Sequence, residues 1–310
     1  MNSNSSNAAP IGLPLVRMGQ GDYVQDYPAA ASPSVLPGTG LNLTKLLIQE
    51  PAEVYHAKAA DNLSSHRLGD FRRCPLLYHW KQTGLSKDED RPAYLLGRAA
   101  HTMILEGRQK FLAEYAIGGP INEKTGHPYG ATTKAFAEWA AAQGKPVLTE
   151  EQATLIEQMA AGVLSHELAR QLLAKGVAEA VVRAQWHSVP CQIRMDFCSQ
   201  LPGAAIVDLK TADDLTWFEA DARRYSYPHQ LAFYRSVLAA AAQVDPRELP
   251  VHLIAVEKKE PFRAGVWRIG EDVLAVAQKE NEAAVKRLRQ CRDSNFWPTG
   301  YEEPRTLDWM

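Results

Sequence analysis

The chain is poor in cysteine and lacks a long apolar run. Its four cysteines, Cys74, Cys191, Cys198 and Cys291, form no dense framework, which excludes the disulfide scaffold of small secreted proteins. No segment approaches the roughly 20 apolar residues that span a bilayer. The first residues show no charged head followed by an apolar stretch of the signal-peptide type. We therefore expect a soluble, cytoplasmic protein that has no membrane partner.

Charge of one sign is also scarce. The formal net charge is -2, from 34 Lys and Arg against 36 Asp and Glu, which excludes a globally basic nucleic-acid-binding protein. Contacts with a nucleic acid would have to come from local patches. With 310 residues, 45% of them apolar, the chain can bury one large core or two modest ones.

The first 40 residues differ in composition from the rest. Residues 1–40 are rich in Asn, Ser, Ala, Pro and Gly and carry little that could form a packed face. They predict a flexible N-terminal tail, and residues 41–310 predict one folded domain without an internal repeat.

Helical patterns dominate the first half of the domain. Apolar spacing and capping residues predict helices from Leu41, from Ser64 or Ser65, from Pro75 and over 93–106, where Gly107 offers a stop. Residues 117–130 resemble a loop. Thr149-Glu150-Glu151-Gln152 is a capping-box sequence that opens a helical region ending near Gly176.

Strand patterns follow. Residues 177–188, 192–197 and 204–210 predict a three-stranded meander, with Pro202-Gly203 as the second turn. A helix from Pro228 through Leu238, a buried strand over 251–256 and a long helix over 272–290 complete the prediction.

Asp208 and Lys210 are charged residues at the end of an apolar strand. Alternate side chains of a strand share a face, so both point the same way, and Asp196 on the preceding strand can join them across the hairpin. Burying two acids together is costly unless a cation neutralises them. The pattern predicts a divalent metal beside a lysine, as in phosphodiester hydrolysis. The alternative is a surface ion pair of small energetic value, which the buried lead-in over 204–207 disfavours.

The neighbouring residues also have alternative interpretations. Met195 and Phe197 are expected to face the core, with Asp196 on the side of Arg194, where an Asp–Arg pair is the alternative to a metal ligand. Glu179 is either a third carboxylate or part of a solvated strand face. A lone histidine such as His101 on an apolar helix is more often a core residue than a ligand.

Gln230 and Tyr234 lie one helical turn apart, and Tyr227 extends the same stripe. The alternative is ordinary helix amphipathicity. A glutamine on an apolar side needs a partner, however, which a DNA phosphate or a metal-bound water would supply. Phosphate contacts are also expected from basic residues, each of which taken alone is more often a solvated charge: Arg72, Arg73, Arg223 and Arg224.

Five segments carry a resemblance to a known family. They are similar to the histidine motif, first acidic motif, D-x-K motif, Q-x-x-x-Y motif and tail of the RecE-like (exodeoxyribonuclease VIII) branch of the PD-(D/E)XK nuclease superfamily. The resemblance spans roughly residues 41–309, and Met195 stands where the acidic motif usually has proline. The segments are Gly97-Arg98-Ala99-Ala100-His101, Arg194-Met195-Asp196, Val207-Asp208-Leu209-Lys210-Thr211, Tyr225-Ser226-Tyr227-Pro228-His229-Gln230-Leu231-Ala232-Phe233-Tyr234 and Phe296-Trp297-Pro298.

The resemblance implies an α/β fold, with a PD-(D/E)XK nuclease-like mixed central β-sheet flanked by helices and a helical N-terminal part. It implies that residues 41–310 are an exonuclease domain that uses Mg2+ or Mn2+ and degrades linear double-stranded DNA from a 5′ end. Relatives form closed rings and work with a single-strand annealing protein of the RecT type in DNA recombination, including that of phage. We therefore expect a homo-oligomeric ring acting on double-stranded DNA ends with such a partner.

The resemblance also raises His101 to a site residue and suggests roles for the others. His101, Glu179, Asp196, Asp208 and the carbonyl of Leu209 would hold the metal. The catalytic set would be Asp196, Asp208, Lys210, Gln230 and Tyr234, with Lys210 orienting or helping to deprotonate a water and the last two placing the water or the phosphate.

A rival resemblance concerns residues 64–75, which are similar to the opening of RecB and Cas4 nucleases. There the counterpart of Cys74 is a ligand of an iron–sulfur cluster, which needs three more cysteines near the C-terminus. Only Cys291 lies there, so we expect no iron–sulfur cluster and interpret Cys74 as a buried thiol. The remaining alternatives are a RecB- or Cas4-like single-strand nuclease, a restriction-type endonuclease and a non-catalytic DNA-binding module on the same fold.

Overall fold

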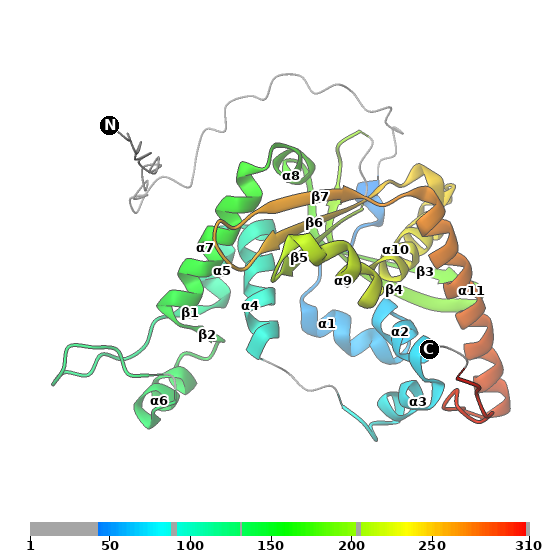
Figure 1. The fold of residues 1–310 in the computed structure, drawn as a ribbon, viewed down its shortest axis with the longest axis horizontal. Helices are drawn as coiled ribbons and strands as arrows, with labels where there is room; N and C mark the ends of the chain where they lie inside the picture. Colours follow the sequence, from blue (N-terminus) through cyan, green and yellow to red (C-terminus); the bar gives the residue numbers. More distant parts are fainter. Residues whose placement is uncertain (1–42, 88–91, 131, 203–205, 308–310) are drawn as a thin grey trace, which may run out of the picture. The chain divides into compact units, whose positions relative to one another are not determined.

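The fold is a computed structural model that describes residues 43–87, 92–130, 132–202 and 206–307 (Figure 1). The tail predicted for residues 1–40 lies outside these ranges, as does part of the turn predicted at Pro202-Gly203. None of the helices within the described ranges is long and apolar enough to cross a membrane.

A mixed five-stranded sheet forms the centre of the domain (Figure 1). The pairs are antiparallel except β5 with β6, which run parallel. The predicted meander and the buried strand after it are confirmed, but the last strand was missed, because it is a short edge strand that is only partly buried and lacks an apolar alternation. In spatial order the strands are β3 (Gly176–Trp186), β4 (Val189–Ser199), β5 (Ile206–Ala212), β6 (Val251–Glu257) and β7 (Ala264–Arg268).

Helices cover both faces of this sheet, each over its own apolar cluster. Ile206 packs in one cluster and Val207 in the other, as the alternation of a strand requires. Strands buried on both faces are near-continuous apolar runs, which is why β6 was recognised from sequence. One face carries α2 (Ser65–Arg73), α3 (Pro75–Thr83), α10 (Tyr227–Ala242) and α11 (Glu271–Ser294); the other carries α4 (Pro92–His101), α5 (Arg108–Glu114), α7 (Glu150–Ser165) and α8 (Glu167–Leu173).

Helix starts follow the predicted capping residues. Ser64 Oγ accepts the amide of Arg67 at the start of α2, and the Thr149 capping box of α7 is complete. The helical region after Thr149 is split in two, however. His166 is extended, and its Nδ1 accepts the amide of Ala169 to start α8. Histidine is not among the usual capping residues, so the break was missed.

The helix predicted over 93–106 changes type in the middle. It is α-helical to His101 and continues as a π-helix, η3 (Thr102–Glu106). Gly107 then ends it with φ +89°, a conformation that favours glycine. Single π-turns are frequent at functional sites, and this one follows His101 directly.

The remaining elements are short. The helix expected from Leu41 is a single 3-10 turn within the described part of the chain. These elements are η1 (Leu43–Leu46), α1 (Ala52–Ala57), η2 (Lys58–Ala60), β1 (Ala116–Ile117), α6 (Lys134–Ala142), β2 (Val147–Leu148), η4 (Leu215–Trp217), α9 (Phe218–Arg224) and η5 (Pro246–Glu248).

Candidate active site

Asp208 and Lys210 share one face of β5, as the strand alternation predicts. Asp208 is fully buried, and its Oδ2 forms an ion pair with Lys210 Nζ. Leu209 between them packs into the apolar cluster on the opposite face. The strand thus delivers an acid and an ammonium to the side of the sheet that α10 covers.

Asp196 joins this pair from β4. Its Oδ2 accepts the amide of Leu209 at 2.8 Å, beyond the point where the β4–β5 ladder ends at Phe197 and Val207. A carboxylate oxygen therefore takes the place of a backbone acceptor. This bond fixes the acid against the strand that carries Asp208.

His101 links the same residues from α4. Its Nε2 lies 2.8 Å from the Leu209 carbonyl and 3.2 Å from Asp196 Oδ2, and its Nδ1 lies 2.8 Å from the Gly97 carbonyl. All three neighbours are acceptors, so both ring nitrogens act as donors. The histidine is therefore part of the site rather than of the apolar core, and in this arrangement it holds Asp196 as an imidazolium.

Gln230 and Tyr234 project from α10 onto the same acid. Gln230 Nε2 donates to Tyr234 Oη at 3.0 Å and to Asp208 Oδ1 at 3.4 Å. The partner expected for this glutamine is thus provided by the protein itself. Tyr227, which the sequence analysis placed on the same helical stripe but not among the site residues, also reaches the site. Lys210 Nζ lies 5.0 Å from its ring centroid.

The alternation of β4 reverses at Asp196. Met195 packs in the cluster under α10, whereas Phe197 packs in the cluster under α4, so the expectation that both face one core is wrong. The ladder to β3 skips Asp196 and Glu179, and Glu179 has φ +52°. Such interruptions re-aim side chains near active sites. This one turns Asp196 toward Leu209 and His101.

Glu179 lies across from Asp196 but is held by another group. Arg194 Nε is 2.7 Å from Glu179 Oε2, so Arg194 pairs with Glu179 and not with Asp196. Burial, reinforced by the charge of Asp196, raises the pKa of Glu179 to about 7. Its role as a metal ligand stays a prediction.

The pKa values of Asp196 and Asp208 are shifted in opposite directions. Burial, and then the charge of Asp196, raises the pKa of Asp208 above its usual range. Burial opposes ionisation of Asp196 too, but His101 beside it lowers the pKa of Asp196 below its usual range. Divergent pKa values of neighbouring acids are typical of functional sites.

The donor set fits a hard divalent cation. Asp208 Oδ2 is buried, and the Lys210 ammonium is its partner in the described structure. Two carboxylates and the Leu209 carbonyl are oxygen donors of the kind that Mg2+ takes together with waters and phosphate oxygens. Within residues 43–87, 92–130, 132–202 and 206–307, no group of three or more His, Cys, Asp or Glu side chains is arranged to hold a metal ion.

The four arginines expected to contact DNA fall into two pairs. Arg72 donates to Asn281 of α11 at 2.7 Å and ties α2 to that helix, and Arg73 pairs with Asp70 at 3.0 Å. Arg223 and Arg224 are exposed at the end of α9, directly before the helix that carries Gln230. The second pair is the better placed for phosphate, and DNA contact by either pair stays a prediction.

The cysteines are all free thiols. Cys74 is only partly buried, contrary to the expected buried thiol, and its Sγ accepts the amide of Leu77 to cap α3. Cys191 and Cys198 are buried within β4.

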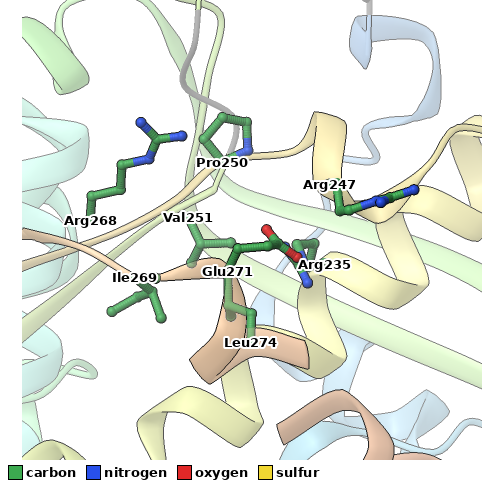
Figure 2. A pocket seen from close by; sticks show the side chains of 9 residues that line it. Arg235, Arg247, Pro250, Val251, Arg268, Ile269, Glu271 and Leu274 are labelled. Carbon is green, nitrogen blue, oxygen red and sulfur yellow. The ribbon is translucent and has the colours of Figure 1, made fainter. Parts of the chain in front are cut away.

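A pocket of about 270 Å³ lies away from these residues (Figure 2). One of its lining residues is Val251, which pairs with Ile206 at the start of the parallel strands β5 and β6. Lys210 pairs with Ala255, four residues further along the same strands. Four residues of strand correspond to about 13 Å. Figure 2 shows Arg247 and Arg268 extending to opposite sides of the Arg235–Glu271 pair. The pocket is therefore neither the acid site nor a convergent group of cations.

Comparisons with known proteins agree with this geometry. A family model described as a PDDEXK-like domain of unknown function (DUF3799) matches residues 64–306. No curated protein matches the chain. Among solved structures, a crystal structure described as a "Putative exonuclease" from Eubacterium rectale has a TM-score of 0.58 at 17% identity, covering 85% of this chain and 96% of that one. At this identity the likeness shows the fold, a mixed sheet flanked by helices, as expected from the sequence.

Proposed function

Because the chain belongs to the PDDEXK-like domain family DUF3799, and so to the PD-(D/E)XK superfamily, we propose that it is a metal-dependent exonuclease that hydrolyses linear double-stranded DNA. One observation carries this proposal. A fully buried Asp208 carboxylate pairs with Lys210 and lies beside a second acid, Asp196, which is held on the adjacent backbone. Two neighbouring buried acids with shifted pKa values beside a lysine are typical of functional sites.

Asp196, Asp208 and the Leu209 carbonyl would hold the cation, and His101 and Glu179 are further ligands that we propose on the family resemblance. As a ligand, His101 would bind through Nε2 in its neutral form, in place of the proton that Nε2 directs at the Leu209 carbonyl and Asp196 in the arrangement described above. When bound, Mg2+ or Mn2+ would lower the pKa of a water and offset charge on the phosphate. The donor chemistry suits Mg2+, for which Mn2+ can substitute.

Lys210 is assigned to orientation rather than proton removal. Burial disfavours its ammonium form, but Asp208 and Asp196 beside it raise the pKa of Lys210 above its usual range. A charged ammonium donates hydrogen bonds, so Lys210 Nζ would hold the attacking water or a phosphate oxygen. Gln230 and Tyr234 fix the Asp208 carboxylate and contribute placement.

We further propose the RecE-like properties that the motifs suggest. These are digestion in the 5′ to 3′ direction, a homo-oligomeric ring around the duplex, and cooperation with a RecT-like annealing protein in recombination or phage DNA processing in the cytoplasm. Duplexes labelled at one end report the direction. The mass of the protein in solution, with and without DNA, reports the assembly.

The test of the proposed function is a substrate panel. Linear and closed circular DNA, each double- and single-stranded, is incubated with Mg2+, with Mn2+ and with chelator. We expect loss of linear duplex from its ends with either metal only. Cutting of closed circles would indicate an endonuclease, exclusive digestion of single strands a RecB- or Cas4-like enzyme, and binding without hydrolysis a non-catalytic module.

A further inference from the structure

A row of four side chains leads from the catalytic lysine to the surface. Lys210 Nζ lies 5.0 Å from the ring centroid of Tyr227, the rings of Tyr227 and Tyr225 are stacked with centroids 5.9 Å apart and planes at 28°, and Arg224 Cζ lies 5.5 Å from the Tyr225 ring. The row ends at an exposed ring, because Tyr225 is 57% accessible. An exposed aromatic ring thus ends a row of contacts that begins at the group that would hold the scissile phosphate.

The backbone fixes the position of these rings. Ser226, between the two tyrosines, has φ +58°, which ends α9 and redirects the chain into α10. The amide of Tyr225 donates to the Asp221 carbonyl at 2.8 Å. Tyr227 also contacts Phe218, a fully packed ring that lies against Trp267. The stack is therefore held by tertiary packing and not by the turn alone.

Packing against other side chains accounts for the presence of the Tyr227 ring but not for that of the Tyr225 ring. Tyr227 is half-buried between Lys210 and Phe218. Tyr225 leaves more than half of its surface in water, so it contributes little to the core. Single exposed aromatic rings are common and need no explanation. What sets Tyr225 apart is a guanidinium on its ring and a stacked connection to the catalytic lysine.

The ligand that fits this arrangement is a nucleobase. Every base has a π-face that stacks on an aromatic side chain, and an adjacent arginine adds a cation–π contact or a phosphate contact. A base inside a duplex is already stacked on both sides, so the ring can stack on it only after it has left the duplex; among paired bases, only those of the terminal pair keep an open face.

We propose that Tyr225 is the stacking platform for a base that has left the duplex next to the scissile phosphate, with Tyr227 as the positioning residue that sets the platform against Lys210. The inference rests on the proposed function and deepens it. The substrate class is a DNA end whose terminal nucleotides are unpaired when they enter the site. Arg224 holds the same nucleotide through its ring contact or its phosphate.

The experiment pairs a protein change with a DNA change. The dissociation constant is measured in Ca2+, without hydrolysis, for a duplex with three unpaired end nucleotides and for versions with an abasic site at each of them in turn. For wild-type protein, one abasic position weakens binding by about 5- to 150-fold, the range of one base–aromatic stack. Tyr225→Ala weakens binding to the complete DNA to the same extent, and the abasic site then has no further effect.

Two variants serve as controls. Tyr225→Phe keeps the ring and binds as wild type does. Tyr301→Ala removes another exposed tyrosine that carries an arginine, since Arg305 Cζ lies 4.2 Å from its ring, and leaves binding unchanged. A 2-aminopurine at the responsive position is quenched by the wild-type protein and by Tyr225→Phe but not by Tyr225→Ala.

The outcomes separate the two proposals. If the wild-type protein hydrolyses no DNA with Mg2+ or Mn2+, the proposed function is overturned. If it hydrolyses DNA but no abasic position weakens binding, or the abasic and Tyr225→Ala effects multiply, the stacking platform is overturned while the nuclease assignment stands. The abasic series on wild-type protein decides this even if Tyr225→Ala is unstable.

Discussion

Two regions that contain buried charge, the pocket beside α10 and the acid site, differ in how that charge is paired. In the pocket at the start of β6, Arg235 is 2% exposed and pairs at 2.7 Å with Glu271, whose side chain is 49% exposed. In the acid site, Asp208 is completely buried and faces a second acid, Asp196, that raises its pKa. In the pocket, the buried charge of Arg235 is balanced by an exposed partner. Two buried acids side by side, rather than an open pocket, therefore mark the candidate active site.

The most severe way to test this contrast is Asp208→Asn. Loss of the carboxylate removes a ligand that offsets charge in the transition state, worth several kcal/mol, or about a thousandfold in rate at 1.36 kcal/mol per factor of ten. Because the asparagine is neutral beside Asp196, the melting temperature should not fall. Initial rates of linear-duplex hydrolysis and a melting curve measure both. Hydrolysis at the wild-type rate would refute the role of Asp208.

Lys210→Met tests the cationic side of the site. The variant keeps an apolar stem but loses the donor aimed at the reacting oxygens, and the loss of one such donor costs about 10²- to 10³-fold in rate. DNA binding in Ca2+ should change only a few-fold, so the split between rate and affinity is the readout. The matched control is Lys58→Met, because Lys58 also pairs with an acid, Glu50 at 3.0 Å, but on the surface. Equal losses in the two variants would contradict the assignment.

Changes near the pocket should alter the stability of the protein rather than its rate of DNA hydrolysis. His252 pairs in register with Arg268 and is 4% exposed. Burial, and then Arg268, lowers the pKa of His252 from 6.5 to about 4. In the unfolded state His252 takes up a proton at a higher pH than it does in the folded state. The free energy of unfolding should therefore fall as pH is lowered from about 6.5 to about 4, and His252 should not change it above that range.

The full loss is about 3 kcal/mol at 1.36 kcal/mol per pKa unit. Urea unfolding at several pH values measures it, and His252→Leu should flatten the acid limb. His127→Gln, a change at an exposed histidine, should keep the wild-type slope. A wild-type curve that coincides with that of His252→Leu would show that His252 does not titrate in this window.

Glu271→Gln gives the smallest expected effect and completes the comparison with Asp208→Asn. Arg235 would keep its burial but lose its charged partner. The cost is about 1–2 kcal/mol, since half of Glu271 is exposed and solvent screens the pair. Hydrolysis should be unchanged. A large loss of activity with unchanged stability would place the pocket in the reaction after all.

The sequence predicted the parts of the site that local spacing determines. Asp208 and Lys210 share a face because of the two-residue repeat of a strand, and Gln230 and Tyr234 share one because of the helical turn. The Ser64 cap and the Thr149 capping box were recognised for the same reason, since each is a contact within one turn.

Other features depend on contacts that no local pattern contains. The reversal of β4 at Asp196 arises because its carboxylate bonds to the Leu209 amide in another strand. The π-helix after His101 accompanies contacts between that ring and β5. The edge strand β7 exists because β6 offers it a partner, and its own sequence has a weak strand pattern. Family resemblance, rather than spacing, identified His101 as a site residue.

The parallel pairing of β5 with β6 also bears on when the acid site can form during synthesis of the chain. The strand that carries Asp208 and Lys210 is supported on one side by residues 251–257, which leave the ribosome only after α9 and α10. A nascent or truncated chain that stops before residue 251 lacks this pairing, and β5 then has β4 as its only strand neighbour in the described sheet. We therefore expect the acid site to be completed late in translation, after residues 251–257 have emerged.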